Sequence, residues 1–265
     1  MNNKTYEKFM NLKLTNYWLF PRVFGDSNNI ALSKEMIQRC IGREIEEISL
    51  IIPECNEDGG YLTHGVRYDV KFKGDNKFYI VEMQNYHDSL IKRSNYEAAV
   101  TMVNAFDPGS GYDKLQDILV IYICTFDYFG FGKARYVIEQ KLQGFPELQL
   151  DSNITTIILN TTARSEEKEL DALMKYLNDA NAEDSFTEKL ENTIQAIKQN
   201  QITRGDFMTL EEVIRYERKI ESEEQKKADR IEFCKKMLSN NIPIDVIINC
   251  TGLSELEIQE IQKQN

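Results

Sequence analysis

The chain has 265 residues, of which 42% are hydrophobic and 10% aromatic, a composition typical of a folded globular protein and not of a disordered one. Its length allows a substantial core, in one large domain or in a domain with an appendage. The formal net charge of −11 argues against broad, nonspecific binding of nucleic acids, although a local basic groove is compatible with it.

The sequence shows no targeting or membrane segment. No apolar run approaches the roughly 18 residues that a membrane span needs, and the polar N-terminus lacks the apolar stretch of a signal peptide. The cysteines are scattered, odd in number and form no CxxC motif: Cys40, Cys55, Cys124, Cys234 and Cys250. We therefore expect reduced thiols in a cytoplasmic protein without a membrane contact, and no zinc site.

The N-terminal part predicts two helices and a strand. Residues 5–14 form a short helix, and an aromatic cluster that packs in the core follows at residues 17–24. Apolar residues at helical spacing predict a second helix that begins at Ser33 as its N-cap and stops at Gly42. Glu35 lies in this helix, either as an acid favoured by the helix dipole or as an extra metal ligand. Residues 45–52 are strand-like or transitional, and residues 53–60 are expected to form a loop.

A β-hairpin is predicted next. Two β-prone runs, residues 66–73 and 77–84, are separated by Gly74-Asp75-Asn76. With Asp75-Asn76 as the two-residue loop, Gly74 pairs with the residue at 77, and the register can be counted along both strands. This register places position 69 opposite position 82.

The open end of this hairpin carries a polar cluster. Asp69 falls opposite Glu82, and Gln84 shares the face of Glu82 while Met83 points away, because successive strand residues alternate. Two carboxylates are costly to bury together without a cation or donors, and a hard divalent metal is the usual solution. An acidic pair on adjacent strands is also often only a solvated edge, and this alternative stays open.

A basic and aromatic helix follows the hairpin directly. Residues 88–106 read as a helix in which Lys92, Arg93 and Tyr96 occupy one side. These side chains serve either solubility and local hydrogen bonding, or the binding of a phosphate and the orientation of the carboxylates. The pattern does not decide between the two roles.

The remaining strands lie in the middle of the chain. Residues 118–126 are an almost continuous apolar run, which predicts a central buried strand, and residues 154–159 predict another. Residues 107–111 form a loop, and no element is assigned to residues 128–150. With the hairpin, these runs predict a sheet of about four strands with helices before and between them.

The composition changes past residue 161. Residues 165–240 are rich in charge, poor in Gly and Pro, and helical in period. A capping box at Thr209 predicts the start of a long helix that runs to about residue 239. We therefore place a domain boundary at residue 165, with a sheet domain at residues 1–165 and a helical extension at residues 166–265.

Two short helices are predicted at the end of the chain, at residues 243–250 and 254–263. Ser254 opens the second one with a capping box. A helix pair around Gly252 can indicate a helix-turn-helix, but the second helix is acidic, whereas a DNA-reading helix needs basic or amide residues. We favour a packing or protein-contact role, with which an oligomer formed through the C-terminal helices is compatible.

These residues together resemble a known family, the PD-(D/E)XK nuclease superfamily, and specifically its recombination-promoting nuclease and transposase branch. Asp69 matches the motif aspartate, and Val81-Glu82-Met83-Gln84 matches the branch's form of the (D/E)XK string. The matching features elsewhere are Lys92-Arg93-x-x-Tyr96, the N-terminal Trp18-Leu19-Phe20-Pro21-Arg22-Val23-Phe24-Gly25, and the C-terminal Thr251-Gly252-Leu253-Ser254 with Glu257-Ile258. The resemblance covers most of the chain.

The resemblance implies an α/β fold with a restriction-endonuclease-like core, a mixed sheet flanked by helices. It implies a DNA endonuclease in which Asp69, Glu82 and the main-chain carbonyl of Met83 hold Mg²⁺ or Mn²⁺. Gln84 then orients water or a phosphate oxygen. Arg93, with Lys92 and Tyr96 beside it, contacts the substrate phosphate. The superfamily's motif lysine is replaced by Gln84, as is usual for this branch.

Two other functions stay open. The chain is either an active nuclease or a module that keeps the fold without useful catalysis and binds DNA or a protein as a regulator. The replacement of the lysine by Gln84 and the acidic balance favour the second function. An interaction protein that associates through its helical C-terminal third is compatible with both.

Overall fold

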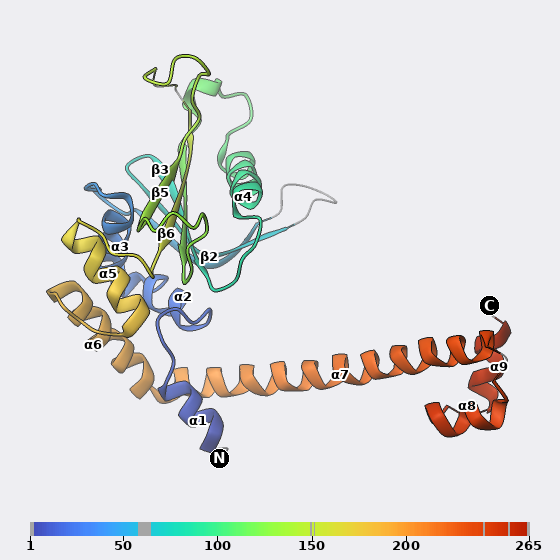
Figure 1. Cartoon of the computed structure of the whole chain (residues 1–265). Helices are drawn as coiled ribbons and strands as arrows, with labels where there is room; N and C mark the ends of the chain where they lie inside the picture. The colour runs from blue at the N-terminus through green and yellow to red at the C-terminus, as the bar shows by residue number, and fades with distance from the viewer. Residues whose placement is uncertain are drawn as a thin grey trace. The chain divides into compact units, whose positions relative to one another are not determined.

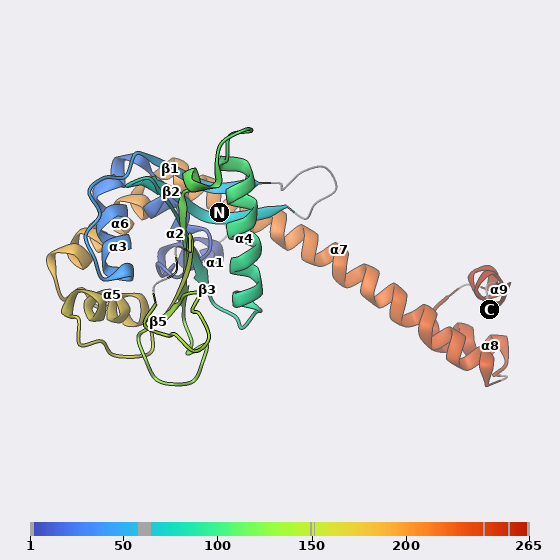
Figure 2. The same ribbon diagram turned by 90° about the horizontal axis from the view of Figure 1, so that it is seen from above.

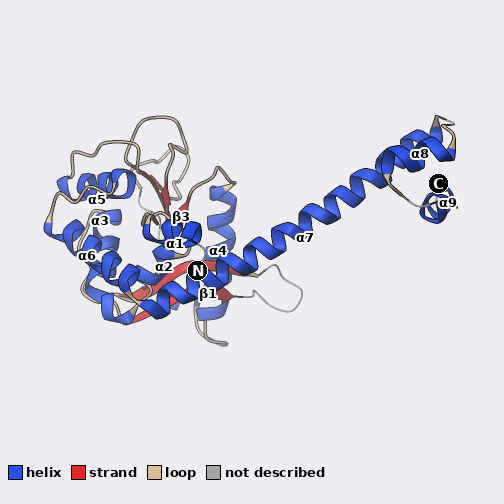
Figure 3. Cartoon of the chain, turned by 90° about the horizontal axis from the view of Figure 1, so that it is seen from below, coloured by secondary structure: helices blue, strands red, loops and turns tan. Residues whose placement is uncertain are grey.

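The computed structural model describes residues 3–57, 65–148, 150, 152–240, 242–253 and 255–263. The chain divides into two compact units, one formed by Glu7–Gln201 and the other by Ile202–Asn265 together with Met1–Tyr6. Strands occur in the first unit, whereas the described residues of Ile202–Asn265 form helices (Figure 3).

The first unit is built on a six-stranded mixed sheet with the order β1-β2-β3-β4-β6-β5. Antiparallel pairs join β1 to β2, β2 to β3 and β5 to β6, while β3, β4 and β6 run parallel. The strands are β1 (Leu50–Glu57), β2 (Val66–Gly74), β3 (Lys77–Gln84), β4 (Asp117–Cys124), β5 (Arg135–Ile138) and β6 (Ile154–Asn160). The mixed sheet is confirmed, but the predicted count of about four strands was too low.

The two strands beyond the predicted four lie at the edges of the sheet, and the strand-like residues 45–52 overlap the first of them only at residues 50–52. The expected loop at residues 53–60 is wrong as far as residue 57, because β1 continues through Pro53. Proline lacks a backbone donor and is tolerated where no second partner strand needs one, as at this edge. β5 has four residues, of which none is fully buried, so it carries too little apolar pattern to be found.

Helices cover both faces of the sheet (Figures 1 and 2). α4 (Leu90–Ala105) packs on β4 and β6 on one face. On the other side lie α2 (Leu19–Phe24) and α3 (Ile30–Ile41), and α5 (Lys168–Asp179) and α6 (Ser185–Gln199) pack on α3. The predicted central strand is confirmed, since seven of the eight residues of β4 are buried.

The N-terminal helices differ from the prediction at their starts. α1 spans Asn3–Met10, and α3 begins at Ile30, after the short 3₁₀ turn η1 (Ser27–Asn29). Ser33 is therefore inside α3 and not its N-cap; its buried hydroxyl donates to the carbonyl of Phe24 at 2.8 Å. Gly42 does end the helix, in the left-handed region with a φ of 72°, where glycine is favoured.

The sheet unit continues past the change in composition. α5 and α6 follow β6 and belong to the unit that ends at Gln201, so residue 165 lies within it. Contacts between α3 and both of these helices extend the core beyond the sheet. The division into domains at residues 1–165 and 166–265 remains a prediction about which part folds by itself.

The C-terminal helices are α7 (Gln201–Ser239), α8 (Ile244–Thr251) and α9 (Glu255–Lys263). α7 begins before Thr209, whose hydroxyl donates to the carbonyl of Gly205 within the helix, so the predicted capping box is wrong. Ser254 lies outside the described residues. Apolar residues of the end of α7, of α8 and of α9 form a small core of their own: Cys234, Ile247, Leu253, Ile258 and Ile261. Among the described helices, none is both long and apolar enough to cross a membrane.

Candidate active site

The hairpin of β2 and β3 has the predicted register. Asp75 and Asn76 have φ angles of 48° and 57°, the left-handed values of the type I′ turn that closes two-residue hairpins. Gly74 pairs with Lys77, and the ladder continues regularly to the pair of positions 70 and 81. The local turn chemistry therefore determines which residues meet at the open end.

At Asp69 the ladder between β2 and β3 ends, and the ladder between β1 and β2 is interrupted for one pair. The neighbouring pairs Pro53–Val70 and Cys55–Tyr68 are formed, but Glu54 and Asp69, which oppose one another between them, are not paired. Glu54 has a φ of 44°, a conformation that a non-glycine residue seldom adopts in a strand. An opposed irregularity of this kind frees the backbone of Asp69 from β1.

The irregularity also shifts the alternation of side chains along β2. Tyr68 and Lys71 are an odd number of residues apart, yet both face α4, and the Lys71 ammonium lies 5.6 Å from the centre of the Tyr68 ring. Asp69 lies at the shift and is directed toward the end of β3. Its backbone N–H donates to Oε1 of Glu82 at 3.1 Å, and its Oδ2 accepts from the N–H of Met83 at 2.9 Å.

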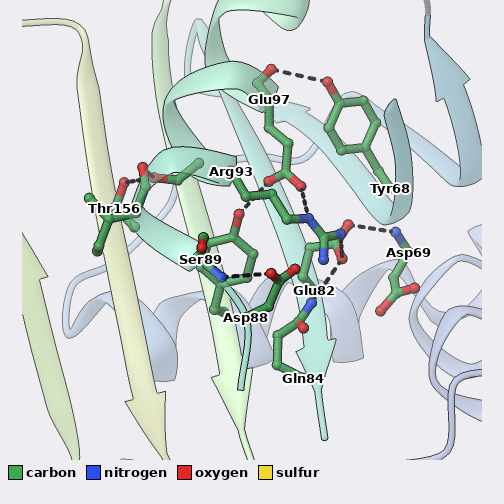
Figure 4. A network of polar contacts seen from close by, with 12 residues as sticks. Tyr68, Asp69, Glu82, Gln84, Asp88, Ser89, Arg93, Glu97 and Thr156 are labelled. Carbon is green, nitrogen blue, oxygen red and sulfur yellow. Dashed lines mark hydrogen bonds and ion pairs between the residues drawn. The ribbon is translucent and has the colours of Figure 1, made fainter. Parts of the chain in front are cut away.

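Glu82 is the centre of this cluster (Figure 4). Its side chain is 3% exposed, although it ends in a carboxylate. Besides the bond from Asp69, Oε2 accepts from Nη2 of Arg93 at 2.8 Å and from Nε2 of Gln84 at 3.3 Å. The structure thus brings together Asp69, Glu82, Met83, Gln84 and Arg93 from two strands and one helix.

Glu97, which the sequence did not single out, holds Arg93 from behind. Nε of Arg93 donates to Oε1 of Glu97 at 2.6 Å, and the hydroxyl of Tyr122 donates to Oε2 at 2.7 Å. The hydroxyl of Tyr68 also donates to the backbone carbonyl of Glu97 at 3.0 Å. Glu97 is fully buried on the face of α4 that packs on the sheet. A glutamate on the apolar face of a helix, four residues after an arginine, was the signal that could have revealed it.

The other two predicted substrate residues lie elsewhere on α4. Lys92 is exposed, and so is Tyr96, at 41%, whereas Arg93 is one-third exposed and turned toward Glu82. Adjacent helical positions point about 100° apart, so Lys92 and Arg93 cannot share a direction. Glu35, the other acid considered, forms an ion pair with Arg39 at 2.7 Å.

The acids of the cluster are held where ionisation is costly. Burial raises the pKa of Glu82 well above its ordinary value, repulsion from Asp69 and Glu97 adds to this, and Arg93 opposes it. Burial also raises the pKa of Asp69, against the N–H of Met83 and the charge of Arg93. Burial likewise raises the pKa of Glu97, against Arg93 and the hydroxyl of Tyr122.

The donor set suits a hard divalent cation. In the part of the chain that the structure describes, no three His, Cys, Asp or Glu side chains form a metal-binding group. The carboxylates of Asp69 and Glu82 are close enough to repel each other, and no described residue donates to Oδ1 of Asp69. In an extended strand the N–H and C=O of one residue point to the same side, so the bond from the Met83 N–H to Asp69 implies that its carbonyl also faces β2. Two carboxylates and a carbonyl suit Mg²⁺, which keeps several waters.

A known family accounts for this combination of sheet, hairpin and acids. The family model of the PD-(D/E)XK nuclease family transposase matches residues 14–236, which include the whole sheet and every residue of the cluster. No curated protein and no solved structure matches the chain significantly. Because the family model covers most of the chain, the protein belongs to the PD-(D/E)XK nuclease family transposases.

Proposed function

We propose that the protein is a metal-dependent DNA endonuclease that hydrolyses phosphodiester bonds. The observation that carries the proposal is the convergence of Asp69 and Glu82 where β2 leaves the ladder, with Arg93 against Glu82. Membership in a nuclease family supports it, because the acids lie in the matched segment. The cofactor proposed is Mg²⁺ or Mn²⁺, and the substrate is DNA.

Asp69, Glu82 and the carbonyl of Met83 would hold the ion. When bound, a divalent ion polarises a phosphodiester and lowers the pKa of an attacking water. The protein must keep both acids ionised for this purpose, and Arg93 favours the ionised form of Glu82. Gln84 is neutral, so it would orient the water or a phosphate oxygen without adding charge.

Arg93 has the geometry to bind a phosphate while it supports Glu82. Its Nε and Nη2 bond Glu97 and Glu82, whereas no described residue accepts from Nη1. The side chain is one-third exposed, so a phosphate oxygen could reach this remaining donor. A guanidinium held by two carboxylates cannot swing away, and it would therefore oppose charge on the phosphate from a defined position.

The proposal is tested by the nicking of supercoiled plasmid across a Mg²⁺ titration. Asp69→Asn or Glu82→Gln removes a formal charge from the metal ligands and should abolish Mg²⁺-dependent nicking, with a loss of several kcal/mol of transition-state stabilisation on the order expected for metal catalysis. Asp75→Asn, in the turn of the same hairpin, should nick like the wild type. Wild-type nicking by the Asp69→Asn variant would assign the activity to another site or a contaminant.

A second function, a regulator with the nuclease fold and no useful turnover, is favoured by one observation. Glu82 already has a cation, because Arg93 lies 2.8 Å from it. Gln84 variants address this alternative. Under the nuclease proposal, Gln84→Ala leaves slow, metal-dependent cleavage, and Gln84→Lys retains or raises the rate because an ammonium also opposes phosphate charge. A wild-type chain that neither binds Mg²⁺ at these acids nor nicks DNA would be the regulator.

Two further features remain predictions. An oligomer through the C-terminal helices is compatible with the compact unit that Ile202–Asn265 form with Met1–Tyr6. The cytoplasmic location also remains a prediction from the scattered, unpaired cysteines.

A further inference from the structure

A loop rich in aromatic side chains, two of which are exposed, follows β4 in the sheet unit. We call residues 126–136 the aromatic loop, although the last two already belong to β5; its aromatic members are Phe126, Tyr128, Phe129, Phe131 and Tyr136. Phe131 is 76% exposed and Phe129 is 37% exposed. Large apolar rings in water are ordinary one by one, but adjacent rings on one loop mark a contact surface.

The aromatic loop is fixed by its own hydrogen bonds. The Asp127 carboxylate accepts from the backbone N–H groups of Phe129, Gly130 and Gly132, at 3.3, 2.9 and 2.6 Å. It also accepts from the hydroxyl of Tyr136 at 2.8 Å. The two glycines have φ angles of 74° and 71°, so the loop has the backbone that these bonds require.

The rings of the aromatic loop present flat faces. Phe129 and Phe131 are stacked, with centres 6.5 Å apart and planes 13° from parallel. Tyr128 and Tyr136 each contact the Phe129 ring edge-on, with centres 5.0 Å away. Because Phe129 is braced in this way, Phe131 stays in solvent as the outer ring of a stack and does not collapse onto the core.

The aromatic loop begins at the edge of the sheet that carries the candidate active site. β3 and β4 are parallel with Gln84 beside Cys124, so the segments that follow them leave the same edge. The N–H of Thr125 donates to the carbonyl of Gln84 at 3.0 Å. Beyond this bond, the His87 ring lies 4.0 Å from Phe126, centre to centre. A continuous row of rings therefore connects the segment after Gln84 with the loop.

We propose that the aromatic loop stacks on unpaired DNA bases, and that the preferred substrate is therefore DNA with unpaired bases beside the cleaved bond. Each base has a π face, so stacking on aromatic side chains binds single strands without reading their sequence. The inference rests on the proposed nuclease function and names the kind of DNA it acts on.

The charge of the chain supports stacking as the source of affinity. With a net charge of −11, the protein is poorly suited to bind duplex DNA through phosphate contacts alone. Single strands carry phosphates as well, so the net charge does not distinguish the two kinds of DNA. The difference lies in the bases, because a duplex hides their faces within its stack and an unpaired strand exposes them. An aromatic surface beside an acidic active site therefore favours unpaired over paired DNA.

The test measures DNA binding without turnover, in full-length chain that carries Asp69→Asn. Fluorescence anisotropy in EDTA compares a single strand, its duplex, and the same duplex with an unpaired bubble. Phe131→Ala should weaken binding to the single strand and the bubble about five- to hundredfold, the range of one base–aromatic stack, and change duplex binding less than about twofold. Phe131→Trp, which keeps an aromatic ring, should retain the preference for unpaired DNA.

Tyr112→Ala is the matched control, because Tyr112 is a stacked aromatic that is 83% exposed and lies just before the other end of β4. It should bind all three DNAs like the parent. The proposal is overturned if the parent binds no DNA, if Phe131→Ala keeps the preference, or if both variants lose it equally. If the wild type does not nick DNA but Phe131→Ala still weakens binding to unpaired DNA, the nuclease function is rejected and the stacking site is retained.

Discussion

At each end of the hairpin of β2 and β3 an aspartate accepts hydrogen bonds from backbone N–H groups, but the two aspartates lie in opposite environments. At the turn, the Asp75 carboxylate accepts from the backbone N–H groups of Glu46 and Glu47 at 2.9 and 3.0 Å. At the open end, the Asp69 carboxylate accepts from the N–H of Met83 at 2.9 Å. The bonds from Glu47 and Glu46 lower the pKa of Asp75, whereas burial raises the pKa of Asp69.

A hydrogen bond alone therefore does not determine whether the pKa of an acid is raised or lowered. Water solvates the ionised Asp75, and the two hydrogen bonds that Asp75 accepts fix the turn. At the open end, α4 covers the strands and places the buried Glu97 behind Arg93, so charge there is confined with few partners. A cation stabilises ionised acids that are buried close together, whereas water already stabilises an exposed one.

Apart from changes to Asp69 and Glu82 themselves, the strongest effect is expected at Glu97, which contacts neither of these acids through its own side chain. Glu97→Gln keeps the shape of the side chain but weakens its hold on Arg93, and should lower the rate of nicking about 10- to 100-fold, as outer-shell changes do. The measurement is the initial rate on supercoiled plasmid at saturating Mg²⁺. Asp75→Asn is the control, and an unchanged rate in folded Glu97→Gln would remove Glu97 from the site.

The pH dependence of nicking and of stability should next distinguish Glu82 at the open end from Asp75 at the turn. Because the pKa of Glu82 is raised in the folded state, nicking should rise with pH through a midpoint above the ordinary glutamate value. The folded state holds this proton more tightly than the unfolded state, so Glu82 lowers the free energy of unfolding as pH rises from its unfolded to its folded pKa.

The sign is reversed for Asp75, whose pKa is lowered on folding. Its stabilisation is present above the unfolded pKa and is lost as pH falls through the folded one. Urea unfolding of the wild type, Glu82→Gln and Asp75→Asn at several pH values measures what each acid contributes to the free energy of unfolding. Glu82→Gln should gain stability relative to the wild type as pH rises, and a constant difference would contradict the burial of this charge.

The smallest effect is expected at the turn itself. Asp75→Asn keeps one acceptor for two backbone donors and should lower the free energy of unfolding by about 1 kcal/mol, the value of an ordinary hydrogen bond. Urea unfolding at neutral pH measures it. Asp75→Gly, which permits the positive φ but removes the acceptors, should lower it further, and equal stability of both variants with the wild type would show that the bonds are not formed.

Features that depend on neighbouring residues could be predicted from the sequence. Gly74-Asp75-Asn76 specifies a type I′ turn, the turn sets the register, and the register brings Asp69 to Glu82. The apolar run of β4 and the glycine that ends α3 are likewise local signals, and the structure bears both out. The family resemblance, confirmed by the match over residues 14–236, also depends on these strings of residues.

Features that depend on distant partners could be found only in the folded chain. The break in pairing at Asp69 needs Glu54 on another strand, and the role of Arg93 needs the buried Glu97 and Tyr122. The edge strands β1 and β5 form because a neighbour offers backbone groups, not because of their own apolar pattern. Burial sets both pairing and pKa, and burial is a property of what packs above a residue, which its neighbours in sequence do not specify.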